Sequence, residues 1–170
     1  KISKLFLILP VFFSFKNFAQ KNYYQMKNGK ILTEEQYNKA KEKRLKFLDA
    51  PVSGGDIGAK NATLSIMVGG KEEDFNACKD IFEALGTTVI YEGKSGSGQH
   101  TKMANQIAIA GIMAGISEAI TYGKEVGLDI ETMLKSISNG SASSFHMTNT
   151  APKMNQRDFE AGFYIKHMVK

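Results

Sequence analysis

The chain has 170 residues, 42% of them hydrophobic and 23% charged, a composition that excludes a wholly disordered chain and fits one domain or two small ones. The 22 Lys and Arg residues exceed the 17 Asp and Glu residues, and the net charge of +5 suits an anionic small ligand as well as scattered solvated lysines. The single cysteine, Cys78, excludes a disulfide framework and a cysteine-rich zinc site. We expect no metal site and no nucleic-acid partner.

Residues 1–20 have the pattern of a secretory signal peptide. Lys1 and Lys4 precede the apolar run Leu5–Phe15, and a small residue follows near the end of the segment. The run is short for a membrane span and Pro10 interrupts it, so we expect no membrane association apart from a cleaved signal. The alternative interpretation of this segment is a buried strand or helix.

Residues 21–45 are polar and are expected to form a linker with one short helix. The capping box Thr33-Glu34-Glu35-Gln36 predicts that this helix covers Glu34–Leu45. No residue of this segment suggests chemistry.

Residues 46–93 have the pattern of an α/β domain. Short apolar runs bounded by glycines predict strands at Phe47–Ala50, Thr63–Val68 and Thr87–Tyr91. Apolar residues at three- and four-residue spacing predict a helix over Glu72–Leu85, with Gly86 as the glycine that ends it.

Residues 94–170 are expected to be all helical. Met103–Ile120 is apolar nearly all round, which predicts a long central helix starting near Gly98 and running to about Val126. Gly111 and Gly115 would let a second helix approach one of its faces closely.

Three shorter helices are expected after the long one. Asp129 should cap a helix over Ile130–Ser138, and a further short helix should cover Ser144–Thr150, before Pro152. A last helix should begin at Asp158 and run to the final residue, Lys170.

Two segments outside the apolar runs carry candidate chemistry. Ser53, Gly54 and Gly55 follow the first predicted strand, where exposed backbone N–H groups would form a nest for a carboxylate or another oxyanion. A purely structural Gly-Gly turn is the alternative. The basic stretch Phe163–Lys170 would either meet a phosphate or face water.

Lys102 is the candidate acid–base residue. It lies early in the long helix, three residues before Asn105, so the two side chains share a face. The positive helix end and desolvation both disfavour the ammonium, which would lower the lysine pKa and suit general acid–base catalysis. A lysine that extends its ammonium to water is the alternative, and His100 is a competing candidate.

Taken together, the chain from residue 46 to residue 170 resembles the β-hydroxyacid dehydrogenase family, which includes 3-hydroxyisobutyrate dehydrogenase, tartronate semialdehyde reductase and the glyoxylate and succinic semialdehyde reductases. The matching segments are FLDAPVSGG at 47–55, TLSIMVGG at 63–70, GKSGSGQHTKMANQ at 93–106, Gly140–Phe145 with Pro152 and Met154, and Phe159–Lys170. The resemblance implies an α/β remnant of a Rossmann-type sheet followed by an all-α helical domain like that of 6-phosphogluconate dehydrogenase.

The resemblance also implies an NAD- or NADP-dependent oxidoreductase of small 3-hydroxy acids or their semialdehydes. Lys102 would be the proton donor and acceptor, and Asn105 would hold the same substrate oxygen. Ser53, Gly54 and Gly55 would bind the carboxylate of the substrate. Lys170 would touch the nicotinamide cofactor.

One departure from the family pattern qualifies this interpretation. The glycine-rich Gly-x-Gly-x-x-Gly turn of a Rossmann domain is absent, and residues 1–45 hold one glycine, Gly29. The expected organisation is therefore a leader (1–20), a polar linker (21–45), the later part of a dinucleotide-binding domain (46–93) and an incomplete helical substrate and dimerisation domain (94–170). We expect this chain alone to bind the cofactor weakly or not at all.

Alternatives remain for function and location. The chain could be a non-catalytic, self-associating helical module or an exported fusion remnant, and the helical domain is expected to form a homo-oligomer in either case. The family resemblance favours the cytoplasm, whereas the leader favours export.

Overall fold

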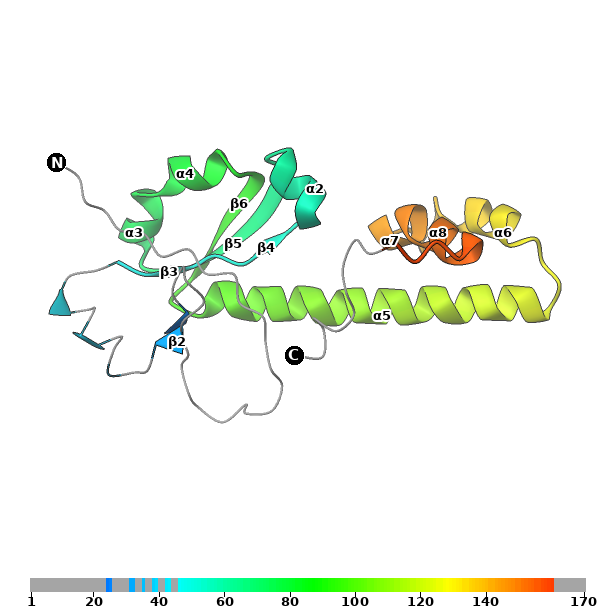
Figure 1. The fold of residues 1–170 in the computed structure, drawn as a ribbon, viewed down its shortest axis with the longest axis horizontal. Coiled ribbons are helices and arrows are strands. Elements are labelled where there is room, and N and C mark those ends of the chain that lie inside the picture. The colour runs from blue at the N-terminus through cyan, green and yellow to red at the C-terminus, as the bar shows by residue number, and fades with distance from the viewer. Residues whose placement is uncertain are drawn as a thin grey trace. The chain divides into compact units, whose positions relative to one another are not determined.

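The computed structural model describes residues 46–160 without a gap, together with residues 24–25, 31–32, 35, 38–39 and 42–43 (Figure 1). The predicted signal peptide and the basic stretch ending at Lys170 lie outside the described residues. Within the predicted helix Glu34–Leu45, described residues 35, 38, 39 and 42 are helical. Before it, two-residue strands β1 (Tyr24–Gln25) and β2 (Ile31–Leu32) pair in antiparallel orientation.

The main sheet is built around β5 (Leu64–Gly70). On one side, β3 (Leu48–Asp49) and β4 (Val52–Ser53) both run antiparallel to it, and the Met67 amide donates to the Pro51 carbonyl between them at 3.0 Å. On the other side, β6 (Gly86–Gly93) runs parallel to it. Because β5 is the middle strand it is buried along most of its length, which accounts for its continuous apolar run.

Residues 51–55, between the first two predicted strands, were expected to form a loop, but Val52 and Ser53 continue the pairing with β5 and a short helix follows at once. This helix, α2 (Gly55–Lys60), starts at two consecutive glycines with positive φ, 125° at Gly54 and 64° at Gly55. Pro51 has no N–H to give to β5, but its carbonyl still accepts from the Met67 amide, so the edge strand is interrupted without being ended.

The helix predicted over Glu72–Leu85 is broken into α3 (Glu72–Asn76) and α4 (Lys79–Glu83). The break falls at Cys78, whose φ of −124° and ψ of 3° leave the helical region. Both pieces still present their apolar residues to the sheet. The spacing therefore predicted the buried face correctly, but the prediction of one continuous helix was wrong.

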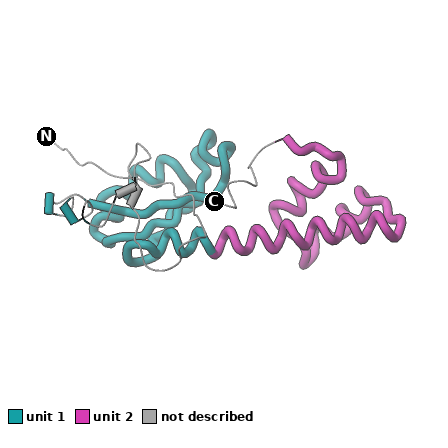
Figure 2. The backbone as a smooth tube through the Cα atoms, turned by 60° about the horizontal axis from the view of Figure 1, so that its bottom comes forward, with its two compact units in different colours: residues 1–103, 162–170 teal, residues 104–161 magenta. Residues whose placement is uncertain are grey.

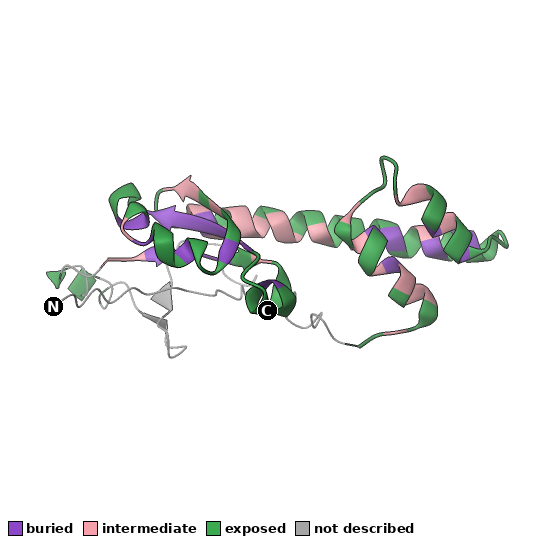
Figure 3. Cartoon of the chain, turned by 90° about the horizontal axis from the view of Figure 1, so that it is seen from above, coloured by how far each residue is buried: buried purple, intermediate pink, exposed green. Residues whose placement is uncertain are grey.

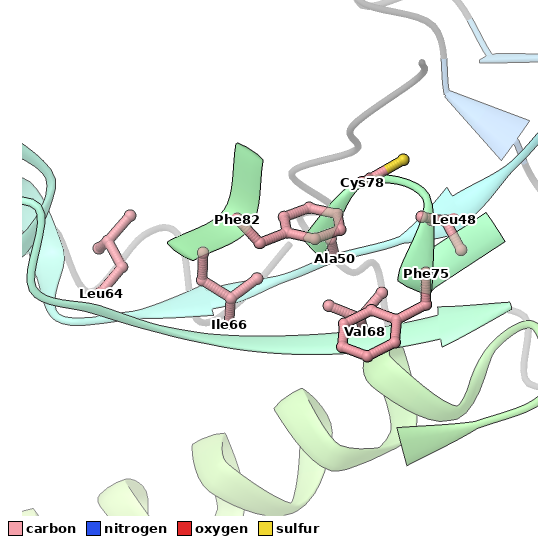
Figure 4. Packing of buried hydrophobic residues seen from close by; sticks show 8 residues of the cluster. All are labelled: Leu48, Ala50, Leu64, Ile66, Val68, Phe75, Cys78 and Phe82. Carbon is pink, nitrogen blue, oxygen red and sulfur yellow. The ribbon is translucent and has the colours of Figure 1, made fainter. Parts of the chain in front are cut away.

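The first core lies between these helices and the sheet. Figure 4 shows the rings of Phe75 and Phe82 over the strands, and Tyr91 stacks on Phe75 with a centroid separation of 5.4 Å. The buried members are Leu48, Ala50, Leu64, Ile66, Val68, Phe75, Cys78 and Phe82.

Gly86 has a different role from the one predicted. Its backbone has no positive φ, so it is not a left-handed helix-ending glycine, and it is instead the first residue of β6. A Cβ atom there would lie 2.2 Å from the carbonyl oxygen of Leu64. Gly86 is needed because two strand backbones approach closely.

After β6, the described chain up to Gln156 consists of helices and the short loops between them. The long helix α5 (Ser97–Glu125) has the expected bounds to within one residue, and α6 (Ile130–Ile137) is capped by Asp129, whose carboxylate accepts from the Thr132 amide at 2.8 Å. Ser144 caps α7 (Phe145–Asn149) by accepting from the Met147 amide at 3.0 Å.

Pro152 belongs to a separate short helix. It lies in the first turn of α8 (Ala151–Gln156), where a missing N–H costs nothing. The described start of the last predicted helix, residues 158–160, is not helical.

The chain divides into two compact units between Met103 and Ala104, inside α5 (Figure 2). The second unit has its own core, in which α5 contributes Ile116 and Ile120 and the three later helices cover them with Ile130, Leu134, Met147 and Ala151.

The long helix α5, predicted to be the central helix of the helical domain, is largely uncovered in this structure. Only 11% of its most apolar 18-residue window is buried, and the helix is mainly exposed or half-buried before Ile116 (Figure 3). The helices after α5 cover only part of it. Within the described residues it is the one helix long and apolar enough to cross a membrane, a criterion that a core helix of a globular protein also meets.

Candidate active site

A glycine-rich turn leads from β6 into α5. Gly93 and Gly96 have φ values of 112° and 93°, conformations that other residues rarely adopt. The turn places the start of α5 against the sheet, where a Cβ atom on Gly98 would lie 2.3 Å from the Met67 carbonyl oxygen. Only glycine allows this contact between helix and strand.

Asp49, at the end of β3, holds the start of α5. Its Oδ1 accepts from the Gly96 amide at 2.7 Å and its Oδ2 accepts from the Gln99 amide at 3.1 Å. A second link comes from the end of β6, where Thr101 donates to Glu92 Oε2 at 3.1 Å. The first turn of α5 is therefore attached to two different strands.

Lys102 follows one residue later and is half-buried. Burial lowers its pKa below the ordinary value of 10.5. In the part of the chain that the structure describes, no carboxylate forms an ion pair with it. Desolvation by burial is the cause of the lowered pKa.

Asn105 lies three residues further along α5 and is half-buried. Its side-chain Nδ2 donates to Oε1 of Gln106 at 3.0 Å. The helix thus places Lys102 and Asn105 on one face, as predicted. His100, the competing candidate, is exposed.

Ser53, Gly54 and Gly55 lie together at the junction of β4 and α2. Ser53 pairs with Ser65 in the sheet, and the Gly54 carbonyl accepts from the Gly58 amide at 2.9 Å. The space beside Gly55 is open, since a Cβ atom there would meet nothing within 4 Å. Among residues 46–160, no hydrogen bond or ion pair joins this group to Lys102 or Asn105.

Two family models match consecutive parts of the chain. Residues 25–93 match the NAD-binding domain of 6-phosphogluconate dehydrogenase, and residues 96–170 match the NAD-binding domain of NADP-dependent 3-hydroxyisobutyrate dehydrogenase. The resemblance was expected to start at residue 46. The first match begins at residue 25 and so extends the resemblance further toward the N-terminus.

Relatives agree with these models. The chain is 58% identical over 131 residues to an uncharacterized oxidoreductase of Bacillus subtilis, an alignment that covers 77% of this chain and 46% of the relative. It is 43% identical over 119 residues to 2-hydroxy-3-oxopropionate reductase of Escherichia coli, covering 70% and 41%. The chain belongs to the β-hydroxyacid dehydrogenase family.

The structure is similar to that of other members of the β-hydroxyacid dehydrogenase family. 3-Hydroxyisobutyrate dehydrogenase of Mycobacterium tuberculosis, solved with L-serine, superposes with a TM-score of 0.69 at 30% identity, over 79% of this chain and 48% of that one. This likeness confirms the predicted fold class, a Rossmann-type α/β part followed by a helical domain. The chain spans about half the length of the curated relatives that it matches.

Proposed function

We propose that this chain carries the proton-transfer and substrate-binding residues of an NAD- or NADP-dependent oxidoreductase that interconverts small 3-hydroxy acids and their semialdehydes. The observation that supports it best is Lys102, a half-buried lysine without a described ion-pair partner and with a lowered pKa. The named activity of the E. coli relative, reduction of 2-hydroxy-3-oxopropionate, supports the same substrate class.

Lys102 is proposed to move the proton of the substrate hydroxyl. A pKa lowered by burial increases the neutral fraction of the amine near neutral pH, and a neutral amine can accept that proton as the carbonyl forms. In the reverse direction the ammonium returns it. Asn105, one turn along α5, is proposed to donate to the same oxygen in place of its bond to Gln106.

The substrate carboxylate is proposed to bind at Ser53, Gly54 and Gly55. The Ser53 hydroxyl and the first amides of α2 are donors, and the absence of side chains at both glycines leaves those amides uncovered. The Asp56 carboxylate beside them is balanced by Lys60, whose Nζ lies 3.3 Å from its Oδ2 and which lowers the Asp56 pKa.

The described residues fit part of a nicotinamide cofactor. Both polar atoms of the Gln99 side chain are buried without a hydrogen-bond partner, and the space beside Gly96 is open, so this turn offers a donor and an acceptor to a bound amide. When bound, the cofactor accepts or supplies the hydride. Lys170, proposed as a further cofactor contact, lies outside the described residues.

A chimera tests this function directly. Residues 46–160 would replace the aligned segment of the E. coli reductase, and oxidation of NADH would be followed with 2-hydroxy-3-oxopropionate and with the semialdehyde of 3-hydroxyisobutyrate. We expect turnover with at least one of them. A folded chimera that binds NADH and turns over neither compound would contradict the proposal. The 170-residue chain, measured in parallel, shows how much of the activity it has alone.

We also propose self-association through the helical unit. Ile107 of α5 is 65% exposed, and Cβ atoms added at Gly111 and Gly115 would meet nothing within 4 Å, so this apolar face has room for another helix. Light scattering should give a mass above that of one chain, 18.7 kDa. Ile107→Lys should lower the mass, whereas Lys124→Glu, on the same helix, serves as the control. A monomer at all concentrations would contradict the proposal.

A further inference from the structure

We infer that Asp49 is a positioning residue, which holds the first turns of α5 against the sheet and thereby sets the burial of Lys102. The effect of Asp49 on catalysis depends on the proposed function, because it acts through Lys102. The contacts that carry it involve backbone groups, and each of them belongs to the first unit.

The carboxylate joins parts of the chain that are far apart in sequence. Gly96 and Gln99, whose amides it binds, are 47 and 50 residues away. An ordinary capping residue directly precedes its helix and orients only the local backbone. Asp49 belongs to a strand paired with β5, so it fixes the helix relative to the sheet.

The carboxylate is also confined on two sides by glycines. A Cβ atom on Gly69 would lie 2.5 Å from Asp49 Oδ2, and one on Gly98 would lie 2.9 Å from the same atom. The glycine on β5 and the glycine on α5 both make room for it. A longer side chain such as glutamate would have to move its carboxylate out of this space.

Lys102 depends on this attachment through the helix geometry. It lies three residues after Gln99, so the two share one face of α5, and a shift of the first turn moves both. The other titratable groups at this end of α5 are Glu92 and Lys94 before it and His100 within it. Glu92 accepts a hydrogen bond from Thr101. If Asp49 were lost, this bond would still attach the start of α5 to β6.

The test uses the 170-residue chain and two substitutions, Asp49→Asn and Asp49→Ala. Asp56→Asn is the matched control, because this exposed aspartate pairs with Lys60 and has no hydrogen bond or ion pair to α5 among the described residues. The first readout is hydrogen exchange at the amides of Gly96 and Gln99. We expect exchange at least about tenfold faster in both Asp49 variants, which corresponds to about 1.4 kcal/mol, and no change in the control.

The second readout is the pH profile of Lys102 labelling by acetic anhydride, measured by mass spectrometry of the Lys102 peptide. If Asp49 maintains the burial of this lysine, the apparent pKa rises toward 10.5 in the Asp49 variants. A role confined to fold stability would leave the profile of the folded variants unchanged. An unchanged or lowered pKa would overturn the inference.

The unmodified chain provides a further measurement if neither variant folds. NMR couplings across the two hydrogen bonds, from the amides of Gly96 and Gln99 to the Asp49 carboxylate, should be detectable, and their absence would overturn the inference. None of these readouts requires turnover. An inactive chimera would therefore refute the proposed function and leave the Asp49 result standing, and the converse also holds.

Discussion

The ammonium Nζ of Lys46 lies 2.5 Å from Oδ1 of Asp74, and Asp74 is the one charged side chain among the described residues that is buried, at 4% exposure. The contact is an ion pair without good hydrogen-bond alignment at that oxygen. The pairing with Asp74 raises the Lys46 pKa above 10.5. The stabilisation from this pair is therefore present below pH 10.5 and is lost as the pH rises through the higher pKa of the folded chain.

Replacing Lys46 should destabilise the first unit. Lys46→Met leaves a buried carboxylate without its counter-charge, and we expect the melting temperature to fall by roughly 5 °C. Lys60→Met is the control, because it breaks an exposed pair and should change the melting temperature by about 1 °C or less. Equal changes in circular dichroism melts of the two variants would contradict this account.

Lys102 should control turnover in the chimera. Lys102→Ala should lower kcat by about 10²–10⁴-fold with a much smaller effect on KM, because proton transfer is lost while other substrate contacts remain. Lys102→Arg should restore little, since a guanidinium does not release its proton. His100→Ala should have a mild effect. The reverse order of effects in steady-state kinetics would assign the proton transfer to His100.

The buried ammonium of Lys102 should also affect stability. A lysine whose pKa is lowered on folding binds fewer protons in the folded chain than in the unfolded one, so the free energy of unfolding rises with pH between the lowered pKa and 10.5. Lys102→Met should increase stability at pH 7 and reduce that rise. Urea titrations at pH 7 and pH 10 measure both effects. A loss of stability at pH 7 would show that the ammonium makes favourable contacts.

The glycines of α5 should respond in opposite directions to alanine. Gly98→Ala should cost about 1–3 kcal/mol, because its Cβ would lie 2.3 Å from the Met67 carbonyl oxygen. Gly111→Ala should gain about 0.5–1 kcal/mol in a monomer, because the position is exposed, helical and open. Urea unfolding at low protein concentration compares them, and two effects of the same sign would refute this interpretation.

The sequence predicted a helix or strand well where a single local pattern, such as an apolar run or a capping side chain, determines it. The long helix contains no proline and no long polar stretch, so its bounds followed from the apolar run, and the cap at Asp129 followed from side-chain chemistry. The break at Cys78 was missed because residues 75, 78 and 82 keep helical spacing across it. Packing against the sheet determines that break.

The residues proposed for the candidate site could be chosen from the sequence, but the contacts that hold them in place could not. Lys102 and Asn105 could be paired from their spacing alone. Asp49 was not recognised, because its partners are 47 and 50 residues distant and periodicity carries no information at that range. The glycines at 69 and 98 were the available signal, since each lacks a side chain where a carboxylate needs room.

The break between α3 and α4 places the only thiol of the chain inside the first core. Cys78 is 2% exposed, so a thiol-specific reagent can reach it only when this packing opens. The second core has no cysteine, and its opening leaves the labelling rate unchanged. The rate at which an aromatic disulfide reagent modifies the native chain therefore reports the opening of the sheet and its helices separately from the helical unit.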